Sequence, residues 1–457
     1  MTTPSSTGTQ REIGFWICTA LVVGNTIGIG IFMTPAALAP YGLNALIAWL
    51  IVVIGCVGVA GVFAGLARLF PQDDGPYSYT VRAFGGGIAF FSVWCYWVSI
   101  WVTNATIAIG VVGYLSAVIP ALNSGPLVPP VAATILVWVF VLLNLRGVRT
   151  VGGLQILTVV LKLVPMLAVM VLGAWELLTA PSAYTQHVPT TPFNVADISA
   201  ATTIALFAML GIECGTIPAG RVRDPSRTIP RATIAGTALT ALIYISVFVV
   251  PLFLIPQDEL AKSNAPFADL LSRFLGSGYG QTLALFVVIS GLGALNGWTL
   301  MAGELTQSFA RHGTLPPALG KVNARGMPTR ALVLTGAAAS VMLLGAGFMQ
   351  QLHYMNSIAD VFAFFSVVVA AANLPLYLFC ALAVLVLWRR GEIGGLQRRE
   401  TFLLFAAVLA TLFAIWAFKG AGFLSLVCAI GLGLIGVPVY LWMRRSHRTV
   451  AGVRGGA

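Results

Sequence analysis

Twelve apolar runs, each long enough to cross a lipid bilayer, dominate this sequence. They cover residues 13–38, 43–70, 88–120, 128–145, 153–179, 198–218, 233–255, 281–308, 329–350, 358–388, 401–418 and 422–443. A helix rises about 1.5 Å per residue, so each run can span about 30 Å of hydrocarbon. Because lipid cannot hydrogen-bond an open backbone, such runs must be helical. The sequence therefore predicts an all-α, polytopic membrane protein with twelve transmembrane helices.

The charge content excludes a water-soluble globule. Only 9% of the 457 residues are charged, whereas soluble domains average about 25%. The net charge of +11 also gives no reason to expect nucleic acid as a partner, because so few charges cannot form a basic face.

The basic residues instead indicate how the helices are oriented. Twenty-one of the 25 Lys and Arg residues fall in the two tails and in the loops after spans 2, 4, 6, 8 and 10. Positive charge marks the cytoplasmic side of membrane proteins. Both termini are therefore expected in the cytoplasm, with residues 1–12 and 444–457 as tails.

Two of the predicted helices carry breaks near their centres. Helix 1 has three glycines in seven residues, at Gly24, Gly28 and Gly30, and helix 6 has Gly211 and Gly215. Glycine weakens a helix, and unwound backbone is tolerated in a membrane only where it lines a cavity. Taken singly, each glycine group is equally compatible with close helix packing.

The spacing of the two breaks along the chain indicates how the helices are organised. Helices 1 and 6 occupy matching positions if residues 13–179 and 198–388 are two five-helix repeats, with 401–443 as two additional helices. An odd number of helices per repeat forces the second repeat to be inverted. Paired broken helices in such repeats indicate a transporter's substrate site. The helix start after Gly28 would attract a carboxylate, and freed carbonyls would accept from an ammonium, which suits an α-amino acid.

Several stretches of the sequence resemble the amino acid–polyamine–organocation (APC) transporter family, and within it the bacterial arginine/agmatine antiporters. They are GNTIGIGIF at 24–32, LGIECG at 210–215, GRVRDPSRTIP at 220–230, GWT at 297–299 and RHGTLP at 311–316. The resemblance covers essentially the whole chain. It implies a LeuT-like five-plus-five inverted repeat, alternating access and a bacterial inner-membrane location.

Lys162 is the one lysine inside a predicted span. It lies about 15 Å into helix 5, near the midplane, where charged side chains are costly and usually functional. Snorkelling to the interface is the simpler explanation, but no interface is within reach. We expect its ammonium to be held by carbonyls of broken helix 1, and it could load and release a proton during transport.

The break and the resemblance together imply a set of substrate-binding residues. These are Asn25, Thr26, Ile27, Gly28 and Gly30 on helix 1, Tyr96, Ser99 and Asn104 on helix 3, Phe207 and Gly211 on helix 6, and Trp298 on helix 8. On helix 3, positions 96, 100, 104 and 107 share one face. Aromatic residues at helical spacing are more often packing than binding residues, and the resemblance is what raises Phe207 and Trp298 above that.

The gate implied by the resemblance is incomplete. Glu213 matches the carboxylate that serves in gating or proton coupling, and Tyr96 matches one of its two tyrosine partners. Leu376 stands where the second tyrosine is expected, Phe207 replaces a tryptophan, and Lys162 replaces an alanine.

Two transport functions follow. Exchange of basic amino acids or their decarboxylated amines is favoured by the chain-wide resemblance, and proton-coupled uptake of neutral amino acids with Lys162 as the switch is favoured by the departures. A channel lacks a ring of pore-lining charges, and an enzyme lacks a catalytic cluster. No cofactor or metal is expected. Protons, membrane lipid and a second copy of the chain in a homodimer are further candidate partners.

Overall fold

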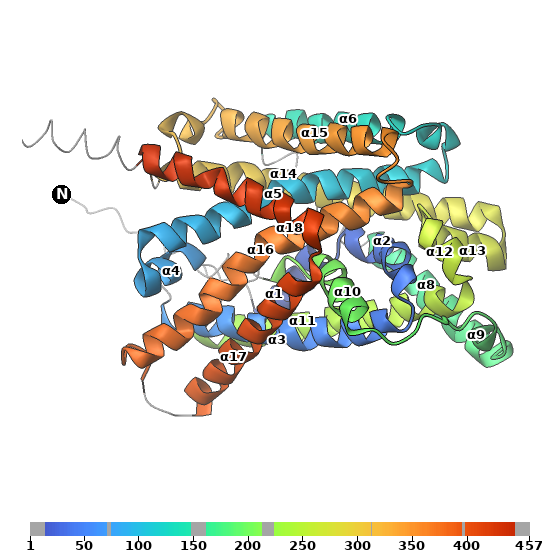
Figure 1. Cartoon of the computed structure of the whole chain (residues 1–457), viewed down its shortest axis with the longest axis horizontal. Coiled ribbons are helices and arrows are strands. Elements are labelled where there is room, and N and C mark those ends of the chain that lie inside the picture. The colour runs from blue at the N-terminus through green and yellow to red at the C-terminus, as the bar shows by residue number, and fades with distance from the viewer. Residues whose placement is uncertain are drawn as a thin grey trace, which may run out of the picture.

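A computed structural model describes residues 14–70, 75–147, 161–212, 224–311, 313–394 and 398–443. Every regular element in these ranges is a helix, and the longest helices lie alongside or across one another in a single bundle (Figure 1). The predicted all-helical, polytopic architecture is therefore confirmed.

Nine of the described helices are long and apolar enough to span a membrane. They are α3 (Asn44–Leu69), α5 (Gly86–Ser116), α6 (Val128–Leu145), α11 (Pro225–Leu254), α14 (Ser277–Arg311), α15 (Thr329–Gln351), α16 (Ile358–Arg389), α17 (Arg398–Gly420) and α18 (Phe423–Leu434), the last continuing to Met443 as a span.

The remaining predicted spans correspond to shorter apolar helices. Span 1 is the pair α1 (Phe15–Thr26) and α2 (Ile29–Leu38), bent by 45° at the break, which makes a tenth candidate span. Spans 5 and 6 correspond to α8 (Leu163–Thr179) and α10 (Val195–Ala208), and their other ends lie outside the described residues. The count of twelve thus stays a prediction, as does the division of the chain into repeats.

Small residues let the helices approach closely. The glycines of α3 face α17, and a Cβ added at Gly55 would lie 2.2 Å from the Phe413 ring. Close backbone approach through small residues is a main source of helix association in lipid. The contact extends along the helix, because Cβ atoms at Gly61 and Gly65 would meet Ala406 and Leu403.

Helix α5 occupies the centre of the bundle. It packs on both α14 and α16, while α6 pairs with α15 and α3 pairs with α11 (Figure 1). The short helices pack on these longer ones: α1 packs on α11, and α10 packs on α3. Of the two broken helices, α2 packs on α5, and α10 packs on α2 and α16.

Four short helices outside the apolar runs were not predicted. They are α4 (Pro76–Phe84), α9 (Ala183–Gln186), α12 (Gln257–Lys262) and α13 (Pro266–Leu275). On α13, Phe267 lies edge-on to Phe32 of α2 with 5.6 Å between ring centroids. The backbone N–H of Phe267 also donates to the Tyr114 hydroxyl of α5, at 3.3 Å. Helix α13 therefore covers the ends of α2 and α5.

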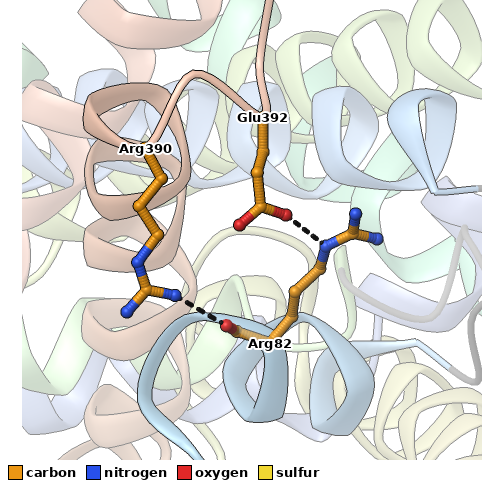
Figure 2. A network of polar contacts seen from close by, with 3 residues as sticks. All are labelled: Arg82, Arg390 and Glu392. Atoms are coloured by element: carbon orange, nitrogen blue, oxygen red, sulfur yellow. Dashed lines mark hydrogen bonds and ion pairs between the residues drawn. The ribbon is translucent and has the colours of Figure 1, made fainter.

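At the opposite end of α5, polar contacts anchor α4 (Figure 2). Arg82 Nε donates to Glu392 Oε2 at 2.6 Å, and Arg390 Nη1 donates to the Arg82 carbonyl at 3.0 Å. The Arg82 guanidinium also lies 4.4 Å from the centroid of the Phe70 ring. Exposed ion pairs contribute only about 0–1 kcal/mol, so these contacts mainly fix where α4 lies.

The contact between α10 and α17 gives a test of this packing. A Cβ at Gly420 would lie 1.9 Å from the Ser199 carbonyl oxygen, so Gly420→Ala must push the two helices apart. Overpacking of this kind costs about 1–3 kcal/mol. We expect a clear fall in the thermal unfolding temperature of the purified protein in detergent.

Gly345→Ala is the matched control, because no heavy atom lies within 4 Å of a Cβ at that helical position of α15. Its unfolding temperature should equal or slightly exceed that of the wild type. Equal stability of the two variants would contradict the close contact at Gly420.

Candidate functional site

The break in helix 1 leaves backbone carbonyls without their helical partners. Helix α1 ends at Thr26 and α2 begins at Ile29, and the backbone of Ile27 and Gly28 between them is extended. In an unbroken helix, the carbonyls before the break would accept from N–H groups four residues further on. Inside a membrane no water replaces those bonds, so other donors must supply them.

Two side chains from other helices supply the missing donors. Lys162 Nζ donates to the Gly24 carbonyl and, at 2.9 Å, to the Ile27 carbonyl. The Tyr244 hydroxyl of α11 donates to the Thr26 carbonyl at 3.0 Å. Both side chains are buried. The expected contact between Lys162 and helix 1 is present, and the ammonium also suits the negative end of α1.

Helix 6 also stops near the middle of its apolar run. Helix α10 ends at Ala208, and Gly211 follows with φ of 103°. That left-handed conformation favours glycine, which has no Cβ to clash. Glu213 and Gly215 lie outside the described residues.

A cavity lies where the two breaks meet. It is lined by Thr26, Gly28, Ile29, Gly30, Thr103, Ile107, Phe207, Ala208, Leu210 and Trp298. Its volume is about 20 Å³, enough for one or two water molecules, since one needs about 10–15 Å³. An amino acid can enter only if the surrounding helices or side chains move.

The walls of this cavity are close-packed on one side. A Cβ at Gly30 would lie 3.0 Å from the Ala208 Cα and 3.3 Å from the Phe207 ring. At Gly28 the nearest atom to such a Cβ is the Ala294 Cβ, at 3.8 Å. Gly30 is therefore the position where α2 and α10 require glycine, whereas Gly28 has room for a methyl group.

The helix ends give the cavity an electrical polarity. The first residues of α2 line it, and Gly28 provides no side-chain cap, so a positive helix end adjoins the cavity. The last carbonyls of α10 form a negative end beside Ala208. No ionisable side chain among the described residues lines this cavity. The arrangement suits the carboxylate and ammonium of a zwitterion.

Five predicted substrate residues share this cavity: Thr26, Gly28, Gly30, Phe207 and Trp298. The Phe207 ring also contacts the Phe362 ring edge-on, with 5.6 Å between centroids. Two more of the predicted residues neighbour it, since Ile27 is buried at the break and Gly211 follows the lining residue Leu210. For Asn25 only the backbone is described, within α1.

The helix 3 residues lie differently. Thr103 and Ile107 of α5 line the cavity. Thr103 was not among the residues predicted from the sequence. Ser99 donates to the Tyr96 carbonyl at 2.7 Å, and the Oδ1 atom of the buried Asn104 has no hydrogen-bond partner in the part of the chain that the structure describes. Thr103 and Ile107 are four residues apart, a spacing visible in the sequence. The roles of Ser99 and Asn104 stay predictions.

Tyr96 instead lines a second pocket, toward the end of the bundle that carries α4. This pocket of about 100 Å³ is lined by Pro76, Tyr77, Phe90, Val93, Tyr96, Leu305, Ser308, Phe309, Thr314 and Leu376. Tyr96 and Leu376, the two positions of the predicted gate, thus meet in one place.

Comparisons with known proteins match nearly the whole chain. A family model described as "Amino acid permease" matches residues 13–445. A cadaverine/lysine antiporter of Escherichia coli (strain K12) is 30% identical over 450 residues, covering 96% of this chain and 97% of the relative.

Two more distant relatives cover similar lengths. A putative arginine/ornithine antiporter of Bacillus subtilis (strain 168) is 29% identical over 94% of this chain and 96% of its own. A putrescine transporter of Haemophilus influenzae (strain Rd) is 27% identical over 94% of this chain and 98% of its own.

The hydroxyl of Tyr244 gives a direct test of the helix 1 break. Tyr244→Phe keeps the ring but leaves the buried Thr26 carbonyl without its donor, which costs about 1–3 kcal/mol. The unfolding temperature in detergent should fall. Tyr279→Phe, which removes a hydroxyl from an exposed ring, should leave it unchanged. A drop of equal size in both variants would contradict the account.

Proposed function

Because the chain belongs to the amino acid permease family, we propose that it exchanges basic amino acids or their decarboxylated amines across the bacterial inner membrane by alternating access. The family consists of membrane transporters, so this multi-pass chain is a transporter and not an enzyme. The exchange of cationic substrates is the proposed step beyond family membership. Cytoplasmic termini are part of the same proposal.

The cavity at the two helix breaks carries this proposal. An uncapped helix start and a helix end of opposite polarity face one small space, which fits the shared backbone of α-amino acids. Phe207 and Trp298 provide aromatic faces for the remainder of the substrate. A cationic side chain or amine is attracted to such faces, in keeping with relatives named for cadaverine, lysine and putrescine.

The helix contacts support the proposed five-plus-five inverted repeat. Numbered as spans, α3 and α11 are helices 2 and 7, α5 and α14 are 3 and 8, and α6 and α15 are 4 and 9. Each of these pairs is in contact. The contact of helix 1 with helix 7 is likewise matched by that of helix 6 with helix 2. Exchanging the repeats reproduces these contacts, and α17 and α18 remain as the two additional helices.

Proton-coupled uptake of neutral amino acids is the second candidate function. It is favoured by two observations on the cavity: no carboxylate among the described residues lines it, and a lysine holds the break beside it. In this alternative the release of a proton from Lys162 loosens helix 1 and permits the change of access. In the exchange mechanism the ammonium holds the break throughout.

Counterflow into liposomes tests the proposal. Vesicles containing the purified protein are loaded with lysine and exposed to labelled lysine, arginine, cadaverine, putrescine, agmatine, alanine or leucine. We expect cationic compounds to enter saturably, and only when a cationic compound is inside. Uptake of alanine or leucine from empty vesicles, driven by a proton gradient, would establish the alternative.

Two substitutions of Lys162 separate the mechanisms. A guanidinium stays protonated throughout the working pH range, so Lys162→Arg retains the charge but cannot cycle a proton. Exchange should survive in Lys162→Arg, with reduced rate because of the larger group, and should be lost in Lys162→Met. Both variants need to elute as single peaks on size exclusion. Full exchange by Lys162→Met would remove Lys162 from the mechanism.

A further inference from the structure

A cavity separate from the substrate site is lined by residues of α3, α11 and α17, and both α11 and α17 pack on α3 (Figure 1). Its volume is about 460 Å³. It is lined by Gly61, Ala64, Gly65, Arg68, Arg227, Pro230, Arg231, Ile234, Arg399, Phe402 and Leu403. Four of these eleven residues are arginines from three different helices.

The arginines that line this cavity outnumber the acidic residues near them. Arg68 lies 3.5 Å from Glu400, and Arg227 lies 3.8 Å from Asp224. Arg231 and Arg399 take part in no ion pair within the part of the chain that the structure describes, and both are exposed. The cavity therefore has surplus positive charge at its rim. Planar guanidinium groups bind phosphate oxygens in pairs of hydrogen bonds.

The rest of the lining is apolar. The floor consists of small residues of α3, Gly61 and Ala64, and the walls carry Ile234 and Phe402. Phe402 is 48% exposed, as a side chain on a lipid-facing wall can be. A soluble phosphate compound has no apolar part that could contact such a surface, whereas a phospholipid has both a phosphate and acyl chains.

We propose that this cavity binds an anionic phospholipid, with the headgroup phosphate among the four arginines and an acyl chain along Phe402 and Ile234. Basic pockets between transmembrane helices on the cytoplasmic side are suited to such headgroups, and the positive-inside pattern assigns these arginines to that side. Helix α11 also carries Tyr244, which holds the Thr26 carbonyl. A bound lipid would thus link α11 and α17 to α3 near the element that supports the break.

Native mass spectrometry of the full chain tests this assignment. The detergent-purified protein is titrated with phosphatidylglycerol and, separately, with phosphatidylcholine of the same acyl chains. We expect phosphatidylglycerol to bind more tightly. In the variant Arg231→Gln/Arg399→Gln its apparent dissociation constant should rise at least tenfold, since each basic residue near the headgroup contributes to attraction.

Arg325→Gln/Arg330→Gln is the matched control, because it removes the same charge from two exposed residues just before and at the start of α15, on the same side. It should bind phosphatidylglycerol as the wild type does. Equal losses in both double variants, or equal binding of phosphatidylcholine, would overturn the proposal. Displacement of the lipid by millimolar inorganic phosphate would also overturn it, because the site would then take the free ion. The readout is lipid binding and does not depend on the transported substrate.

Discussion

The hydrogen bonds of the helix 1 carbonyls are the interaction on which the rest of the structure depends. A membrane supplies no water to an interrupted helix, so the carbonyls of Gly24, Thr26 and Ile27 that the break frees need donors from the protein. Lys162 and Tyr244 provide them from two different helices. These bonds allow α1 and α2 to diverge, and the divergence exposes the helix start that faces the cavity. Without the two donors, a continuous helix would leave fewer carbonyls of this segment without a hydrogen bond.

Once the break is stable, helix ends of opposite sign can serve the two charged groups of an amino acid. In the proposed mechanism, the backbone of an amino acid is recognised separately from its side chain, which would contact Phe207, Trp298, Thr103 and Ile107. The small cavity volume means that binding and helix movement are coupled.

Features that depend on the residues of one short stretch could be predicted from the sequence. Long apolar runs gave the helices, clustered glycines gave the break in helix 1, and the cost of a buried charge singled out Lys162. Features that depend on three-dimensional packing could not. Thr103, which lines the cavity, could not be identified, because a helix that is apolar on every side gives no sequence signal for which face meets a site. Tyr244 was missed because a tyrosine in an apolar run is usually packing, and α4, α12 and α13 were missed because they are shorter than a span. The arginine-lined cavity joins residues more than 300 positions apart, which no local pattern records.

Equilibrium binding of labelled lysine and cadaverine tests most directly whether the substrate occupies the helix 1 break. The account predicts binding to the wild type and at least tenfold weaker binding to Gly30→Val, in which a larger side chain enters the space against Ala208 and Phe207. Trp298→Ala should lose about 1–2 kcal/mol, the value of a desolvated cation–π contact, while Gly345→Ala should bind normally. Unchanged affinity in both Gly30→Val and Trp298→Ala would place the substrate elsewhere and contradict the account.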